Sequence, residues 1–185
     1  MKKLATIILV ICSVSVSFAQ TAKETEMVAL INQVRTNPKS FVPVVEEFIK
    51  NGGNATRFAT KANPKMIAEA KALIVFLNTV KPVDSLKTSS VLYPIAKAHV
   101  NYLDSTKTVS HTGRNGQTLA DRTKSTGLLV GENATTGGDV KLAMLFLLID
   151  YNATVKGHRN NIFNPKYTKV AAANSGGYWV QDFAF

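Results

Sequence analysis

The stretch DVKLAMLFLLID, residues 139–150, is the part of the sequence that most constrains the fold. Asp139 has the side chain of a helix N-cap, and residues 142–149 are apolar on every face of the helix that they predict. A helix of that kind is buried on all sides, so it belongs at the centre of a layered domain and not on its surface.

Downstream of this helix the sequence predicts a polar loop and then a β-hairpin. GHRNNIFNP, residues 157–165, is rich in the glycine, histidine and asparagine typical of loops that carry function. Two apolar runs, residues 170–174 and 178–183, are separated by Ser-Gly-Gly, as in a hairpin turn. With a further strand over residues 128–134, we expect a small sheet that is mostly antiparallel and mostly C-terminal.

Helices precede this sheet, because apolar residues recur at helical spacing in the first half of the chain. The expected helices cover residues 26–36, 39–50 and 65–78, with Thr25 as the N-cap of the first, and a fourth begins at Ser90. The fourth helix carries His99 on its apolar face, so this imidazole should point inward. Helices and strands do not alternate along the chain, which makes the fold class α+β.

Length and composition indicate one globular domain. The chain has 185 residues, of which 45% are hydrophobic and 18% charged, and this excludes extended disorder. A basic start at Lys2 and Lys3, an apolar run and small residues at its end predict a signal peptide over residues 1–19, cut after Ala19. We therefore expect a secreted or periplasmic protein with a single domain over residues 20–185 and no membrane span in the mature chain.

Cleavage would change the charge and the cysteine content. The formal net charge is +10, and loss of Lys2 and Lys3 leaves +8, which favours acidic partners such as an anionic surface. The lysines are spread along the chain without interleaved aromatic residues, so nucleic acid is not an expected partner. Cys12 lies in the signal peptide, so the mature chain is expected to contain neither cysteine nor disulfide.

Four side chains are candidates for a site. His111 and His158, two of the three histidines, stand in polar segments that contain glycine, and histidine is the commonest metal ligand. Glu132 ends a predicted strand, where a buried carboxylate needs a partner or a cation. Asp150 ends the apolar helix, where its charge opposes the helix dipole unless solvent, a cation or a histidine offsets it. Together the four suit a divalent ion such as zinc, although hydrogen bonding between loops is the simpler alternative.

Three motifs in this order resemble the bacterial branch of the CAP superfamily, which includes cysteine-rich secretory proteins, antigen 5 and plant pathogenesis-related proteins. They are Ser110-His111-Thr112-Gly113, Gly131-Glu132-Asn133 and the segment 157–165, and the closing hairpin adds to the likeness. The resemblance implies a three-layer α-β-α sandwich with a cleft that holds two histidines and two acids, and in several relatives a divalent cation.

On this resemblance, His111 and His158 match the family's histidines and are the expected metal ligands. Glu132 matches the acid of the Gly-Glu-Asn motif, and Asp150 is a positional candidate for the second acid; both are possible further ligands. Residues 37–85 depart from the compact family core, so they are expected to form a helical insertion that alters or covers the cleft.

Three functions remain open at this point. The first is a non-catalytic exported binding protein whose cleft holds a cation and an unknown extracellular ligand. The second is a metal-assisted hydrolase of envelope or extracellular substrates, with Glu132 as general base. The third is a purely structural network. The sequence lacks the signatures of serine hydrolases, zincins and phosphate-binding loops, and catalysis is the less favoured alternative.

Overall fold

The computed structural model describes residues 20–53, 63–151, 153 and 155–185, so the predicted signal peptide lies outside the described residues. The elements are α1 (Ala22–Thr36), η1 (Pro38–Phe41), α2 (Val42–Lys50), α3 (Pro64–Thr79), β1 (Lys87–Thr88), α4 (Tyr93–Thr106), η2 (Arg114–Gly116), α5 (Leu119–Thr123), η3 (Lys124–Thr126), β2 (Val130–Thr136), α6 (Val140–Ile149), α7 (Gly157–Ile162), β3 (Lys169–Ser175) and β4 (Tyr178–Ala184). Within these ranges, no helix combines the length and the apolar character needed to cross a membrane.

A four-stranded sheet in the order β1-β3-β4-β2 lies in the middle of the fold. β4 pairs antiparallel with both β2 and β3, and only the short β1 runs parallel to its neighbour β3. The turn between β3 and β4 is Gly176-Gly177, with φ angles of +52° and +89° that glycine adopts without strain. The predicted hairpin and the mostly antiparallel sheet are confirmed, and β2 is an edge strand.

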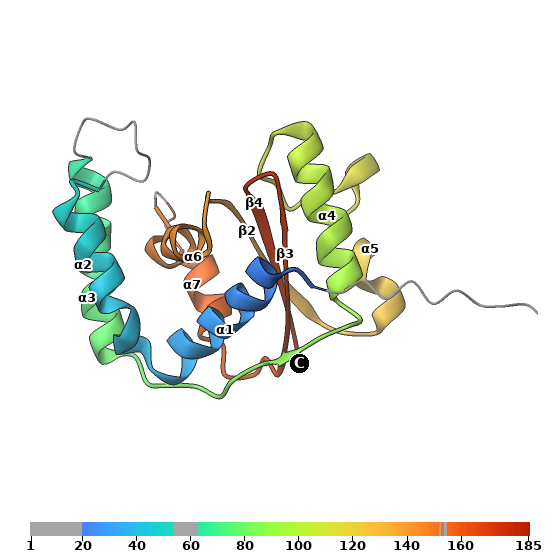
Figure 1. Ribbon diagram of the computed structural model, residues 1–185. Coiled ribbons are helices and arrows are strands. Elements are labelled where there is room, and N and C mark those ends of the chain that lie inside the picture. The colour runs from blue at the N-terminus through green and yellow to red at the C-terminus, as the bar shows by residue number, and fades with distance from the viewer. Residues whose placement is uncertain (1–19, 54–62, 152, 154) are drawn as a thin grey trace, which may run out of the picture.

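Helices cover both faces of this sheet (Figure 1). α4 and α5 lie on one face, and α1, α6 and α7 lie on the other. The side chains of β3 divide between the two layers, because alternate residues of a strand point to opposite faces. Val170 and Ala172 belong to the core that contains α1 and α6, whereas Ala171 and Ala173 pack with α4. The expected α-β-α sandwich is confirmed.

The paired helices α2 and α3 lie outside α6, on the side away from the sheet (Figure 1). Phe48 of α2 and Leu73 of α3 join the same apolar cluster as Leu145 of α6. α6 is therefore enclosed by the sheet layer on one side and by the helical pair on the other. This explains why residues 142–149 are apolar on every face, and the burial predicted for this helix is confirmed.

Several predicted boundaries needed correction. α1 begins at Ala22, four residues before the expected start, and its N-cap is Thr21 and not Thr25. The second predicted helix is split into a 3-10 turn, η1, followed by α2. β2 begins and ends two residues later than expected. By contrast, Asp139 caps α6 as predicted, since its carboxylate accepts the backbone N–H of Leu142 at 2.8 Å.

Candidate functional site

Glu132 of β2 and His111 form the first half of the site. His111 lies in the loop between α4 and η2, and its Nδ1 is 2.8 Å from Oε1 of Glu132. The two side chains differ in exposure, since His111 is 59% exposed and Glu132 only 1%. The hydrogen bond to Glu132 raises the pKa of His111 above its ordinary value, against the opposing effect of burial.

Arg122 of α5 is the cation that the buried Glu132 requires. Its two terminal nitrogens contact the two carboxylate oxygens at 2.8 and 3.1 Å, and one of them also donates to the backbone carbonyl of His111 at 3.0 Å. Burial raises the pKa of Glu132, but the bonds from His111 and Arg122 outweigh it and leave that pKa lowered. Arg122 was not among the residues predicted from the sequence, although Glu132 was expected to need a partner or a cation.

The glycine of the first motif makes room for this arginine. A Cβ added to Gly113 would lie 3.1 Å from Cδ and 3.3 Å from Nε of Arg122. Any larger residue at Gly113 would therefore press on the side chain that neutralises Glu132. This gives the Ser-His-Thr-Gly motif a physical reason for its last position.

A second carboxyl group, that of Asp182 on β4, lies beneath this pair and was also missed. Asp182 is directly opposite Glu132 in the β2–β4 register and is fully buried. Burial, reinforced by the negative charge of Glu132, raises the pKa of Asp182 well above its usual range. Of the two carboxyl groups, Glu132 is therefore the one whose surroundings favour the charged form, and Arg122 and His111 contact it.

We expect Asp182→Asn to make the folded protein less sensitive to rising pH. The raised pKa of Asp182 means that its contribution to stability is complete below the ordinary carboxyl pKa and is lost as pH rises through the folded-state value. Above pH 5 the free energy of unfolding of the wild type should thus fall relative to Asp182→Asn by up to about 1.4 kcal/mol per pH unit. Urea unfolding at pH 5, 6 and 7 measures this, and parallel curves would show that Asp182 is ionised in the folded state.

His158 and Asp150 form the second half of the site. Nδ1 of His158 is 2.9 Å from Oδ1 of Asp150, and the backbone N–H of His158 donates to Oδ2 at 3.0 Å. Asp150 is the C-cap of α6, in the left-handed region with φ +53°. The hydrogen bonds from His158 outweigh burial and lower the pKa of Asp150. The histidine thus offsets the negative charge at the helix end, which was one of the expected solutions.

The two pairs meet across the edge of β2. Glu132 shares the face of the sheet that α4 covers, whereas the side chain of Asn133 reaches the other face and donates to the backbone carbonyl of His158 at 3.2 Å. The rings of His111 and His158 lie with their centroids 6.4 Å apart at an angle of 44°. All four predicted residues therefore come together, as two His–carboxylate pairs at the edge of the sheet.

The donor atoms suit a cation only in part. In each histidine Nδ1 faces a carboxylate, so Nε2 is the nitrogen left over, and neither Nε2 has a partner in the described ranges. A carboxylate behind Nδ1 is the usual support of a metal-ligating imidazole. Among the described residues, however, no three His, Cys, Asp or Glu side chains are placed to hold one ion. Glu132 and Asp150 lie behind the histidines and not beside them as ligands.

A buried amide network holds the strands and α7 in place around the site. Asn133 of β2 donates to Oε1 of Gln181 on β4 at 3.1 Å, and Asn161 of α7 donates to Oδ1 of Asn133 at 2.9 Å. Asn161 also donates to the backbone carbonyl of Glu132 at 3.2 Å. Asn161, the second asparagine after His158 in the segment 157–165, therefore has a structural role: it attaches α7 to β2.

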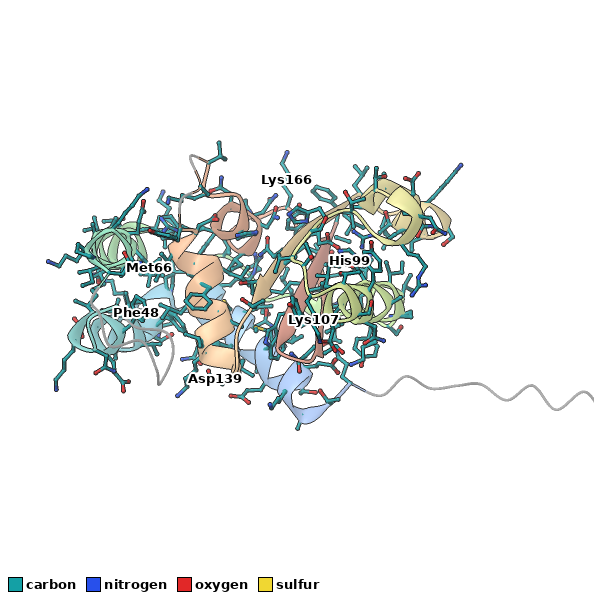
Figure 2. The ribbon with its side chains drawn as sticks, turned by 90° about the horizontal axis from the view of Figure 1, so that it is seen from above. Phe48, Met66, His99, Lys107, Asp139 and Lys166 are labelled. Carbon is teal, nitrogen blue, oxygen red and sulfur yellow. The ribbon has the colours of Figure 1, made fainter. Side chains whose placement is uncertain are left out.

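The helical segment that precedes the sheet reaches the site through α3. A hollow of about 290 Å³ is lined by His158, Asp150 and Met66 of α3, together with Thr135, Phe146 and Tyr151. Nζ of Lys156 bonds to Glu69 of α3 at 2.9 Å and to the backbone carbonyl of Asp150 at 3.0 Å. Figure 2 shows Met66 on the side of α6 away from His99 and the α4 layer. Within residues 37–85, α3 therefore contributes Met66 to the hollow beside His158 and Glu69 to the bond with Lys156.

An α-β-α sandwich with two histidine–acid pairs at the edge of its sheet defines a known class of domain. The model of the cysteine-rich secretory protein family, CAP, matches residues 28–183. The chain belongs to this family, and the resemblance seen in the three motifs is confirmed. No curated protein matches the chain.

The solved structures that are similar to the chain include those of three bacterial proteins. An extracellular protein with an SCP domain from Bacillus anthracis has 21% identity and a TM-score of 0.49, over 65% of this chain and 38% of that one. An outer surface protein from Borrelia burgdorferi has 20% identity and a TM-score of 0.47, over 64% and 89%. A cysteine-rich secretory protein from Staphylococcus aureus has 14% identity and a TM-score of 0.42, over 82% and 40%. The alignment thus spans under half of the Bacillus and Staphylococcus proteins.

Proposed function

We propose that the protein is an exported, non-enzymatic binding protein, in which His111 and His158 hold a divalent cation such as zinc that takes part in binding an extracellular ligand. The observation that carries the proposal is the pair of imidazoles at the edge of β2, each with Nδ1 engaged by a carboxylate and Nε2 left over. Both rings are partly exposed, so an ion and a ligand can reach them. Export rests on the predicted signal peptide.

A binding role is favoured over hydrolysis by the state of Glu132. A general base needs a pKa near the working pH and a free oxygen that faces the reacting water. Glu132 is buried, both of its oxygens bond to Arg122 or His111, and its pKa is lowered. Its position suits a group that orients His111 and fixes its tautomer. A bound cation would supply Lewis acidity and an anchoring point for a ligand.

Zinc should stabilise the chain from Gln20 onward against thermal unfolding, because a ligand that binds only the folded state raises apparent stability. At a free zinc concentration of 100 times the dissociation constant the gain is about 2.7 kcal/mol. His111→Ala and His158→Ala should each lose most of this gain, whereas Lys166→Ala, at an exposed position, should keep it. Differential scanning fluorimetry with zinc up to millimolar concentration measures the shift, and a wild-type midpoint that never moves would refute the cation site.

The effect of His158→Ala on stability in chelator distinguishes the binding role from the purely structural alternative. The network contacts His158 through its backbone carbonyl, which His158→Ala retains, and Asp150 keeps its bond to the backbone N–H of residue 158. We therefore expect His158→Ala to cost less than about 1 kcal/mol in EDTA, the net value of one partly exposed hydrogen bond. A larger loss, measured by urea unfolding, would favour the structural alternative.

A further inference from the structure

A second hollow lies between α4 and the segment 113–122, apart from the two histidine–acid pairs. Its volume is about 460 Å³, within the range of small-molecule pockets. α4 supplies most of the apolar wall, and α5 with the preceding turn supplies a polar wall. The residues that line the hollow include Pro94, Ile95, Ala98, His99, Tyr102 and Arg122. Figure 2 places His99 on the α4 side of the sheet, away from Met66, which lines the hollow beside His158.

His99, a residue of the pocket wall, holds a hydrogen-bond acceptor without a partner among the described residues. Its Nε2 lies 2.8 Å from the backbone carbonyl oxygen of Ser110, and because a carbonyl only accepts, Nε2 carries the proton. Nδ1 therefore holds a lone pair, and it is buried without a partner among the residues that the structure describes. The side chain is fully buried, and the Tyr102 ring stacks on it with the centroids 6.3 Å apart.

Arg122, on the opposite wall of the pocket, holds a hydrogen-bond donor without a partner among the described residues. Its terminal nitrogens are engaged by Glu132 and by the carbonyl of His111, so its charge is already balanced. Its Nε–H is buried and has no partner in the described parts of the chain, in a side chain that is only 8% exposed. Buried donors and acceptors are nearly always paired in folded proteins. In this pocket one acceptor, Nδ1 of His99, and one donor, Nε–H of Arg122, have no partner among the described residues. Both side chains lie against Glu132.

We propose that this pocket binds a small neutral amphipathic molecule with an apolar body and a hydroxyl group. The hydroxyl oxygen accepts from Nε–H of Arg122, and the hydroxyl hydrogen is donated to Nδ1 of His99. The apolar body packs on Ile95, Ala98 and Tyr102. An ionised carboxylate has no hydrogen to donate to Nδ1, and an ether has none either, so the pocket selects a hydroxyl over both.

Binding requires a small displacement of the wall, because neither of the two atoms is open to solvent in this conformation. The exposed Arg114 is the simplest residue to move, since its guanidinium lies over the Tyr102 ring at 6.0 Å from the centroid. The proposed contacts use neither imidazole of the cation site, His111 or His158, so the two proposals can be tested separately.

Three related probes test the proposal by NMR titration of the ¹⁵N-labelled chain from Gln20 onward, with EDTA present. We expect 4-propylphenol to cause saturable shifts of the Tyr102 and Gly113 amides. We expect 4-propylanisole and 4-propylbenzoate to bind at least tenfold more weakly, because each lacks the hydroxyl hydrogen. Equal affinity of the phenol and the anisole, or no saturable shift with the phenol at millimolar concentration, would overturn the proposal.

A matched pair of variants locates the binding. Ala98 is an exposed position of α4 that lines the pocket, so Ala98→Leu fills it without disturbing the core. Ala72 is an exposed position of α3 that does not line it, so Ala72→Leu is the control. Loss of 4-propylphenol binding in Ala98→Leu alone supports the pocket. Retention in Ala98→Leu, or an equal loss in both variants, refutes it.

Discussion

Arg122→Met should lower the free energy of unfolding at pH 7 by about 3–5 kcal/mol, the cost of leaving one member of a buried ion pair without its partner. The guanidinium meets both oxygens of Glu132, whose side chain is 1% exposed. Methionine keeps the length and the apolar packing of the arginine stem but brings no charge. His111 alone would then face the carboxylate, with the buried Asp182 behind it. Urea unfolding of wild type and variant measures the loss.

Two further variants separate charge from packing. Arg114→Met removes an exposed arginine eight residues earlier in the chain, and it should change stability by less than about 0.5 kcal/mol. Adding Glu132→Gln to Arg122→Met should recover much of the loss, because no buried charge is then left unpaired. A loss below about 1 kcal/mol in Arg122→Met, or no recovery in the double variant, would show that Glu132 is not held by this ion pair.

The sequence predicted the central layers because their patterns are strong. Residues 142–149 are apolar on all sides, and the helix that they form is enclosed between the sheet and α2–α3. The hairpin of β3 and β4 was visible in its two apolar runs and in the glycines that its turn requires. In both cases the local preference and the tertiary environment agree.

The start of α1 was misplaced because two threonines compete as N-cap. Thr25 directly precedes the apolar repeat, but Thr21 has a glutamate three residues later and forms the capping box with Glu24. β1 was missed since two exposed residues carry no apolar alternation. Pairing with β3 makes this strand, and the sequence around residues 87–88 does not encode it.

The sequence predicted which residues form the candidate site, but it did not predict how their side chains are hydrogen-bonded to one another. His111, Glu132, Asp150 and His158 do come together, yet each acid supports an imidazole from behind. Arg122 could not be predicted because it is one of many basic residues, and no pattern near it in the sequence indicates that it contacts Glu132. Asp182 was hidden inside an apolar strand, where only the register opposite Glu132 reveals its place.

Glu24→Gln should cost about 3 kcal/mol at pH 7, and the cost should vanish in acid. Glu24 is fully buried at the point where α1 meets α4 and β3. Its carboxylate accepts four hydrogen bonds, from the backbone N–H groups of Thr21 and Asn174, the Tyr93 hydroxyl and Nζ of Lys97, at 2.7–2.9 Å. Glutamine offers one accepting oxygen and turns an N–H towards the remaining donors.

The pH dependence follows from the pKa of Glu24. Burial alone would raise it, but the backbone bonds from Thr21 and Asn174 and the side-chain bonds lower it from 4.5 to about 2. A lowered folded-state pKa gives stability that is complete above the unfolded-state value and is lost as pH falls from about 4.5 to 2, worth about 3 kcal/mol. Urea unfolding between pH 7 and pH 2.5 should therefore show the wild-type and Glu24→Gln curves converging. Glu26→Gln, at an exposed position of the same helix, is the control, and a difference that stays constant with pH would show that Glu24 does not titrate in this range.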